Sequence, residues 1–470
     1  MVRDAINSGK KDIKDIFRRI RNRDFSGNRG LAIKNSIYQF ATNFAFKVGS
    51  LIFTIIIARL LMPELFGLYN LALSTLLVFF AFANLGIAPT IVKFASRELG
   101  KGNEEKARAY VFYTGKIKIL LVIFSSAILL ISAKFISDVF YQKPIFWALI
   151  AGSLYILFYG LEIFLEYILQ ASNHFDKILY KEILFQIFRV ILVPVAVLIS
   201  IKSAVSNQGV LFILFLALAF SYLLISILMF FFQIRKIKYI HSKKKELSRS
   251  EKKITNRFFF AISATAFSGL FFEYVDKIML GHFVQAEFIG YYAAAIGLVG
   301  TLIALEGFGT ALLPIFSQVD KSTLERGLKK SVSAVLLISI ATIILTFVLA
   351  PVIVNIIYGH DYAPSVIVLR LLSLLLIPVP LATIYSSYFI SIGKPKILAT
   401  FLILSTVLNI ILNYVLITSL LSYGGIAAVL GSGVATIISQ GFYLTGLILS
   451  RKRLMQKVTS DSSLSAVGLS

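Results

Sequence analysis

Four basic residues of this 470-residue chain lie within long apolar segments, where a charged side chain is unfavourable, three of them centrally and one near a segment end. They are Lys47, Arg189, Lys277 and Arg370. A charge that faces lipid at the centre of a membrane span costs about 2.5–3.5 kcal/mol on insertion scales. The pattern predicts a cationic, water-filled cavity that accepts an anionic headgroup. The alternative is that these cations pair with acids across helices and only stabilise the bundle.

The acidic residues close to these four cations in the sequence distinguish between the two alternatives only in part. Glu273 precedes Lys277 by four residues, the favourable orientation for an ion pair on one helix, and Asp276 is adjacent. Lys277 is therefore compatible with both alternatives. No acid is near Arg189 or Arg370 in the sequence, so we expect these two residues to line the cavity.

Two further acids, Glu162 and Glu166, also lie four residues apart. Negative charges at this spacing repel each other on a helix unless a cation lies between them or one carboxyl is protonated. We therefore predict Glu162, Glu166 and Glu273 as candidates for coupling transport to a proton or another ion.

Neighbouring polar and proline residues extend the predicted site. Asn43 lies one turn before Lys47 and makes that helix face polar. Pro378 and Pro380 follow Arg370 by about two turns. Because each proline removes a backbone donor and favours a kink, the pair predicts a hinge beside the cavity.

The composition places these residues in a membrane protein. The chain is 58% hydrophobic and 15% charged, more apolar than a soluble domain of this size can accommodate. It contains no cysteine, which excludes disulfides, thiolate catalysis and cysteine-held metals. It also lacks a G-x-x-x-x-G-K-[ST] loop and an H-E-x-x-H motif, and the predicted outer loops are short. We therefore expect no cofactor, no metal and no enzymatic activity.

The helices that would position the site are predicted from twelve apolar windows of roughly 20 residues or more. The windows cover 34–57, 67–92, 110–133, 145–168, 180–201, 208–233, 257–280, 287–313, 331–357, 363–391, 397–418 and 425–450.

A repeated element divides these helices into two similar halves. Glu64–Tyr69 (ELFGLY) returns as Glu287–Tyr292 (EFIGYY), and Gly86 corresponds to Gly309. Six helices per half, repeated in parallel, are typical of transporters. The predicted organisation is a basic N-tail (1–33), a first lobe (34–233), a basic linker (234–256), a second lobe (257–450) and a C-tail (451–470).

The net charge of +24 is concentrated in the N-tail and in the stretches 93–118 and 234–257. The positive-inside rule then places both termini and the linker in the cytoplasm of a multi-pass cell-membrane protein. This distribution predicts binding to anionic lipids of the inner leaflet and argues against nucleic acid. The N-tail is predicted to form an amphipathic helix on that leaflet, with a disordered tail as the alternative.

Four short motifs occur in the order and at the spacing of a known family. They are Ala58–Tyr69, Ala83–Gly86, Tyr274–Gly281 and Gly393–Lys396. Together with the two halves and the buried basic residues, they make the chain resemble the polysaccharide flippases. These are the Wzx-type members of the multidrug/oligosaccharidyl-lipid/polysaccharide exporter superfamily. The resemblance implies an all-α, MATE-like V shape with twelve transmembrane helices in two six-helix lobes.

The resemblance also implies the activity and its site. A flippase of this kind moves a polyprenyl-linked glycan from the cytoplasmic to the outer leaflet by alternating access. The residues implied to attract the pyrophosphate are Lys47, Arg189, Lys277 and Arg370, and those implied to contact sugar hydroxyls are Asn43, Asn84 and Glu306. Asp276 and Lys277 match a family motif. Glycan polymerases or glycosyltransferases are the implied partner proteins.

Two other functions stay open at this point. A cation-coupled multidrug antiporter of the same superfamily needs an intramembrane carboxylate; Lys47 without an acid in the first span argues against it, whereas Glu162 and Glu166 keep it possible. A non-transporting scaffold of a glycan-assembly complex does not require buried basic residues, so their presence counts against it. The glycan, the energy source and the oligomeric state do not follow from the sequence.

Overall fold

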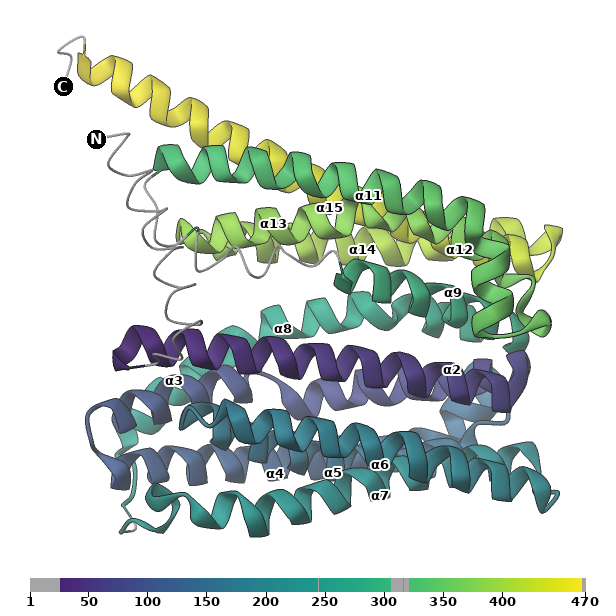
Figure 1. The fold of residues 1–470 in the computed structure, drawn as a ribbon, viewed down its shortest axis with the longest axis horizontal. Coiled ribbons are helices and arrows are strands. Elements are labelled where there is room, and N and C mark those ends of the chain that lie inside the picture. The colour runs from purple at the N-terminus through teal and green to yellow at the C-terminus, as the bar shows by residue number, and fades with distance from the viewer. Residues whose placement is uncertain (1–25, 244, 306–315, 317–320, 467–470) are drawn as a thin grey trace. The chain divides into compact units, whose positions relative to one another are not determined.

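The computed structural model describes residues 26–243, 245–305, 316 and 321–466, and within these ranges it contains helices and short connections but no strand. The predicted all-α class is therefore confirmed (Figure 1). The chain forms two compact units. We call the unit that ends at Ala293 and also includes 357–361 the N-terminal unit, and the other the C-terminal unit.

The described part of the N-terminal unit contains seven complete helices and the start of an eighth. Their bounds are α2 Gly27–Asn84, α3 Ile87–Gly100, α4 Glu104–Lys134, α5 Phe146–Ala171, α6 Phe175–Lys202, α7 Asn207–Phe232, α8 Arg249–Phe283 and α9 Ala286–Leu305. Three short helical segments connect them: η1 Phe135–Tyr141, η2 Ile234–Lys236 and η3 Lys238–His241. Within this unit α2 packs against α6, and α5 packs against α7.

The C-terminal unit contains the rest of α9 and the helices that follow it. Their bounds are α11 Lys321–Ile357, α12 Ser365–Leu372, η5 Ser373–Leu376, α13 Pro378–Ser391, α14 Pro395–Leu420, η6 Leu421–Tyr423 and α15 Gly425–Ala466, with η4 His360–Tyr362 before α12. Leu328 of α11, Tyr385 and Phe389 of α13 and Leu447 of α15 meet in its buried core.

Two breaks shape the first predicted spans. Met62 has a non-helical conformation (φ 59°, ψ 170°) inside α2 and separates the first span from the second. The cause is Pro63, which disfavours helical geometry at the residue before it and has no N–H to donate. The predicted second span, 67–92, is wrong as one continuous helix, because the chain turns at Gly86 (φ 53°) between α2 and α3.

The predicted tenth span, 363–391, is also interrupted. Its helix narrows to the 3-10 segment η5 and restarts as α13 with Pro378 at its first turn. A proline is well suited to this place, because the first N–H groups of a helix have no acceptor within the helix. The structure therefore has an irregular helix at Pro378 and Pro380, whereas hinge motion there stays a prediction.

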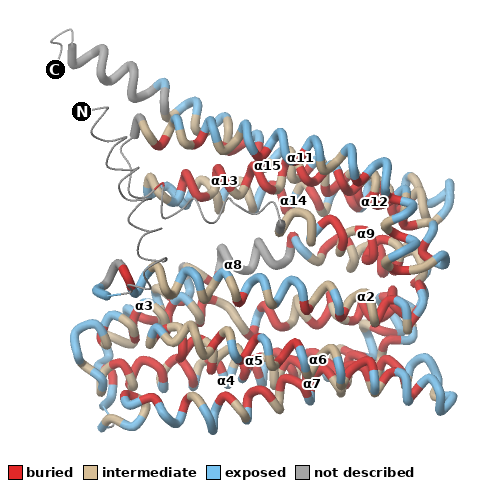
Figure 2. Tube along the Cα trace, viewed as in Figure 1, coloured by how far each residue is buried: buried red, intermediate tan, exposed pale blue. Residues whose placement is uncertain are grey.

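The outer faces of the helices are those of a membrane protein. Large apolar side chains are exposed along α4 and α11, with Ile131 84% and Leu337 72% accessible. Exposed residues recur along α11 in Figure 2. Exposed apolar stripes of this extent are unfavourable in water and match a lipid environment. Ten segments of the described residues are long and apolar enough to span a membrane. One of them, Gly30–Gly100, covers the first two predicted spans, and α8 is not among them, so the number twelve stays a prediction.

The two copies of the repeated sequence element lie against each other within the N-terminal unit. A Cβ added to Gly67 of α2 would lie 1.8 Å from the carbonyl oxygen of Ala286. One added to Gly290 of α9 would lie 2.1 Å from the carbonyl oxygen of Pro63. The repeated glycines therefore allow two helix backbones to touch, as small residues do in membrane interfaces.

We predict that Gly67→Ala or Gly290→Ala lowers the free energy of unfolding by about 1–3 kcal/mol, because a methyl group cannot fit without moving a backbone. Thermal unfolding of the purified protein in detergent measures this loss. Gly300→Ala on α9 is the matched control, since nothing lies within 4 Å of its added Cβ. Equal unfolding temperatures for all three variants would contradict the close contact.

Candidate functional site

Arg189 of α6 places a guanidinium against α2 with no acid to balance it. Its Nη1 donates to the Ser50 hydroxyl at 3.3 Å, and the guanidinium carbon lies 4.0 Å from the centre of the Phe53 ring. The buried Nε has no hydrogen-bond partner, and no carboxylate of the described residues forms an ion pair with Arg189. This group can therefore accept an anion that the protein itself does not provide.

A polar stripe on α2 continues from this point. Gln39, Asn43, Lys47 and Ser50 fall on one face of the helix, because they are spaced by four, four and three residues. The Gln39 amide donates to the Asn43 side chain at 3.2 Å, and Lys47 and Asn43 are exposed. The sequence predicted Asn43 and Lys47 on one polar face, and the helix register agrees with that prediction.

Glu162 and Glu166 form a buried cluster around a lysine. The ammonium of Lys181 lies 2.7 Å from Glu162, 2.6 Å from Glu166 and 3.3 Å from Glu182. The side chains of Lys181 and Glu162 are each 4% exposed. A cation does lie between the two acids, as their spacing required. With all four groups ionised, however, three carboxylates share one lysine, so the cluster has an excess of negative charge.

Lys181 was not predicted as part of the site, because it lies at the start of the predicted fifth span, 180–201, and was assigned to the preceding loop. The signal that could have found it is the short connection between α5 and α6, Ser172 to His174. In an antiparallel helix pair, residues at similar distances from the turn face each other. Glu166 lies five residues before the end of α5 and Lys181 six after the start of α6.

Lys118 of α4 is a second buried cation that the sequence analysis placed with the basic stretch 93–118. Its side chain is among the largest fully buried ones, and its ammonium donates to the Ala83 carbonyl and to the Asn84 side chain, each at 3.0 Å. The Asn84 amide also donates to the Tyr167 hydroxyl at 3.3 Å. These bonds neutralise the carbonyl end of α2. They give Asn84, predicted to contact sugar, a structural function.

The acidic and basic residues of α8 do not pair as their spacing allowed. Asp276 is buried and accepts a hydrogen bond from the Tyr292 hydroxyl of α9 at 2.6 Å. Lys277 is partly exposed, 5.8 Å from the centre of the Tyr274 ring, and has no carboxylate in ion-pair contact in the described part of the chain. Glu273 is exposed. Lys277 therefore remains free to attract an anion.

Arg370 of α12 has a structural partner that its sequence neighbours do not reveal. Pro351 in α11 has no N–H, so the carbonyl four residues earlier, at Phe347, lacks its helical donor. The Nε of Arg370 donates to this carbonyl at 3.0 Å, with the guanidinium carbon 5.1 Å from the centre of the Phe347 ring. This contact supplies the donor that the Phe347 carbonyl lacks, and the expected cavity position of Arg370 stays a prediction.

One predicted sugar contact, Glu306, lies outside the described residues. No group of three His, Asp or Glu side chains in the described ranges has the geometry to hold a metal ion. The arrangement thus offers anion binding at Arg189, Lys47 and Lys277, and proton or cation exchange at the cluster around Lys181.

We predict that Lys181→Gln lowers the free energy of unfolding by about 3–5 kcal/mol, because it leaves three carboxylates without their cation. Adding Glu162→Gln should recover part of this loss by removing one of the repelling charges. The control is Lys177→Gln, one turn earlier on α6, whose side chain has no ion pair in the described structure. If Lys181→Gln unfolds at the same temperature as the control in detergent, the cluster does not stabilise the helix pair.

The described geometry can be compared with known proteins. A model of the family described as polysaccharide biosynthesis protein matches residues 32–320, more than half of the chain. No curated protein matches the sequence significantly.

Solved structures with a similar fold are transporters. The lipid II flippase MurJ, in an inward closed conformation, aligns with a TM-score of 0.68 and 19% identity over 88% of this chain and 87% of that one. An inward-facing multidrug resistance MATE family transporter of the MOP superfamily aligns with a TM-score of 0.66 and 13% identity over 87% of this chain and 95% of that one. A Pyrococcus furiosus transporter of that superfamily, whose description reports a reverse polarity of its binding pocket, aligns with a TM-score of 0.55 and 13% identity over 91% of this chain and 96% of that one.

Sequence identities this low establish the fold alone, whereas the family model matches the whole predicted first lobe and the linker and extends into the second lobe. Both agree with the resemblance drawn from the sequence motifs. This multi-pass membrane protein has the fold of MOP-superfamily transporters and belongs to the polysaccharide biosynthesis protein family.

Proposed function

We propose that this protein moves a polyprenyl-(pyro)phosphate-linked oligosaccharide from the cytoplasmic to the outer leaflet by alternating access. The observation that supports this most is Arg189, a guanidinium in an apolar helix that has no carboxylate partner among the described residues and an unsatisfied Nε. An uncompensated charge is unfavourable in such a place. A pyrophosphate supplies both the missing negative charge and oxygen acceptors that suit the planar donor group of arginine.

The neighbouring side chains suit the rest of such a substrate. Lys47 is a second cation, and it is exposed on the face of α2 that also contains Ser50, the residue that Arg189 contacts. The Asn43 amide can exchange hydrogen bonds with sugar hydroxyls. Lys277 adds a further cation without an ion pair in the described part. In this proposal Asp276 positions its helix through Tyr292, and the lipid tail stays in the bilayer while the glycan crosses.

The proposed orientation follows from the basic loops. Both termini and the 234–256 linker face the cytoplasm of the cell membrane, because their lysines and arginines favour that side. The irregular helix at Pro378 and Pro380 is the proposed hinge, since 3-10 segments and prolines absorb changes in backbone direction.

We predict that Arg189→Gln reduces transport of a fluorescent polyprenyl-pyrophosphate-oligosaccharide in proteoliposomes at least about tenfold, equivalent to about 1.4 kcal/mol. Arg189→Lys should retain part of the activity, because it keeps the charge but loses the bidentate geometry. Arg249→Gln is the control, an exposed arginine with no ion pair in the described residues.

The proposal fails if folded Arg189→Gln transports the lipid at the rate of wild type. If wild type instead expels a cationic dye under an ion gradient and moves no lipid-linked glycan, the multidrug antiporter replaces the flippase. If wild type moves neither substrate, the non-transporting scaffold of a glycan-assembly complex is the remaining function.

The cluster around Lys181 supports ion coupling, a feature that the antiporter alternative also requires. Three carboxylates and one lysine can bind one more proton or small cation without loss of the existing pairs. We propose Glu162 and Glu166 as the coupling groups, with exposed Glu273 as the other candidate.

Glu162→Gln should fold, because Lys181 keeps Glu166 and Glu182 as partners. We predict that an imposed proton or sodium gradient, which should accelerate transport by wild type, has no effect on this variant. Glu104→Gln, at an exposed position on α4, is the control, and Glu273→Gln tests the other candidate. A Glu162→Gln protein that responds to the gradient as wild type does would remove Glu162 from the coupling site.

A further inference from the structure

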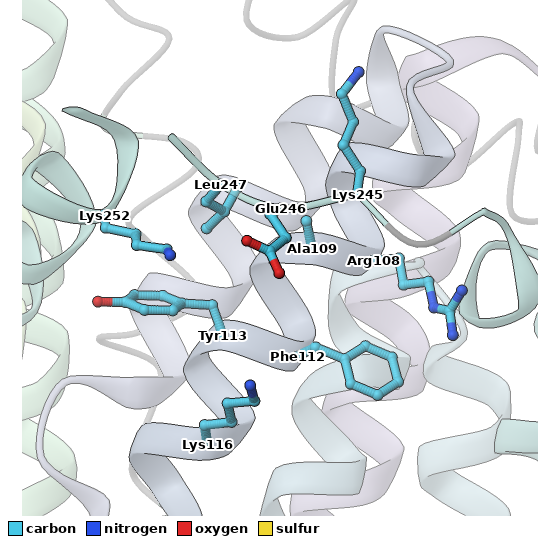
Figure 3. A pocket seen from close by; sticks show the side chains of 9 residues that line it. All are labelled: Arg108, Ala109, Phe112, Tyr113, Lys116, Lys245, Glu246, Leu247 and Lys252. Carbon is cyan, nitrogen blue, oxygen red and sulfur yellow. The ribbon is translucent and has the colours of Figure 1, made fainter. Parts of the chain in front are cut away.

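The linker before α8 covers a basic cavity on the side of the N-terminal unit where α4 begins. The cavity has a volume of about 430 Å³ (Figure 3). Its lining comes from α4, from the segment between η3 and α8, and from the first turn of α8. The lining residues are Arg108, Ala109, Phe112, Tyr113, Lys116, Lys245, Glu246, Leu247 and Lys252.

The linker is anchored to α4 by apolar and polar contacts. Leu247 is buried in a cluster with Phe94 of α3 and with Ala109 and Tyr110 of α4. The guanidinium of Arg108 donates to the carbonyl of Ser242 in the linker. The cavity is therefore enclosed by elements that pack against each other on both sides.

A second set of contacts fixes α8 at the other wall. Lys106 of α4 forms an ion pair with Glu251 of α8, and the Tyr113 hydroxyl donates to the Asn256 side chain at 2.9 Å. The ammonium of Lys252 lies 5.9 Å from the centre of the Tyr113 ring, which places this cation beside an aromatic wall. The positions of Tyr113 and Lys252 are thus set by the packing of α4 against α8.

The charges that line the cavity are unbalanced. Arg108, Lys116, Lys245 and Lys252 contribute four cations, and Glu246 is the one acid among the lining residues. None of the three lysines forms an ion pair in the described structure, and neither does Glu246. Lys116 lies below the Glu246 carboxylate and Lys252 beside it in Figure 3. The excess positive charge favours an anionic ligand.

The cavity also opens onto an apolar surface. Phe112, in its lining, is 50% exposed, and Ile119, Leu120 and Ile123 continue the exposed apolar stripe of α4 at 55%, 68% and 54%. Phe112 lies eight residues from the start of α4 at Glu104, or about 12 Å along the helix. The cations therefore lie at the boundary between polar loops and lipid-facing side chains, the level of lipid headgroups.

We propose that this cavity binds the phosphate headgroup of an anionic phospholipid, with an acyl chain lying along the exposed face of α4. Lys116 and Lys252 contact the phosphate, and Lys245 adds positive charge at the rim. The bound lipid connects the linker to α4 and the start of α8. This site is separate from the transported substrate, so it does not depend on the proposed flippase activity.

Native mass spectrometry of the full-length protein in detergent tests the site directly. The probes are phosphatidylglycerol, phosphatidylcholine with the same acyl chains, and soluble glycerol phosphate. We expect the first bound phosphatidylglycerol to be held more tightly than phosphatidylcholine. Lys116→Gln/Lys252→Gln should weaken it about 25-fold, since each cation near a membrane surface contributes about fivefold.

Lys329→Gln/Lys330→Gln on α11 is the matched control. It removes the same amount of charge, from two exposed lysines that are far in sequence from the residues lining the cavity. The proposal predicts unchanged phosphatidylglycerol binding in this control. Equal weakening in both variants, or no weakening in either, would overturn the specific site. Glycerol phosphate bound as tightly as phosphatidylglycerol would identify a soluble phosphate and overturn the lipid assignment.

Discussion

Charges inside apolar helices need compensation, and the cations of the described helices differ in whether the protein itself supplies it. Lys181 is surrounded by three carboxylates, Lys118 donates to the carbonyl end of α2, and Arg370 donates to the carbonyl that Pro351 leaves free. These three cations have partners within the protein. Arg189 has a hydroxyl and an aromatic ring beside it, but no acid among the described residues pairs with it. The first three cations therefore stabilise helices, whereas Arg189 is suited to bind an anion from outside the protein.

Irregular backbone and small residues shape the described helices for reasons separate from charge. Met62 and Gly86 interrupt the first helices, and η5 interrupts the tenth predicted span. Gly67 and Gly290 let two helices approach until their backbones touch. Because no large side chain separates them, the two helices pack through their backbones. In lipid, helices associate through such close packing rather than through burial of apolar surface.

Composition and periodicity were sufficient to predict the all-α class and most helix positions, and the family followed from a resemblance in four short motifs. The repeated E-x-x-G element was visible in the sequence, but its consequence, contact between Gly67 and Gly290, was not, because contacts between distant segments need the fold. Lys118 and Lys181 were missed for a related reason. Lys181 is the second residue of the predicted span 180–201, where an error of a few residues decides whether a lysine is assigned to a loop or to the bundle. Lys118 lies eight residues inside the predicted span 110–133 but was counted with the basic stretch 93–118.

The function of Arg370 shows a further limit of the sequence. Its partner is a backbone carbonyl, so no acidic residue marks it, and only the four-residue spacing between Phe347 and Pro351 indicates that this carbonyl is free. Arg189 looked similar to Arg370 in the sequence, since neither has an acid nearby. The structure distinguishes them by what their guanidinium groups contact.

We propose above all that Arg189 receives the pyrophosphate of a lipid-linked glycan. A cryo-electron microscopy structure of the protein with a bound polyprenyl-pyrophosphate-oligosaccharide would test this proposal. We expect pyrophosphate density in contact with the Arg189 guanidinium, beside Ser50 on α2. Density for the pyrophosphate elsewhere, with Arg189 still against Ser50 and Phe53 alone, would contradict it.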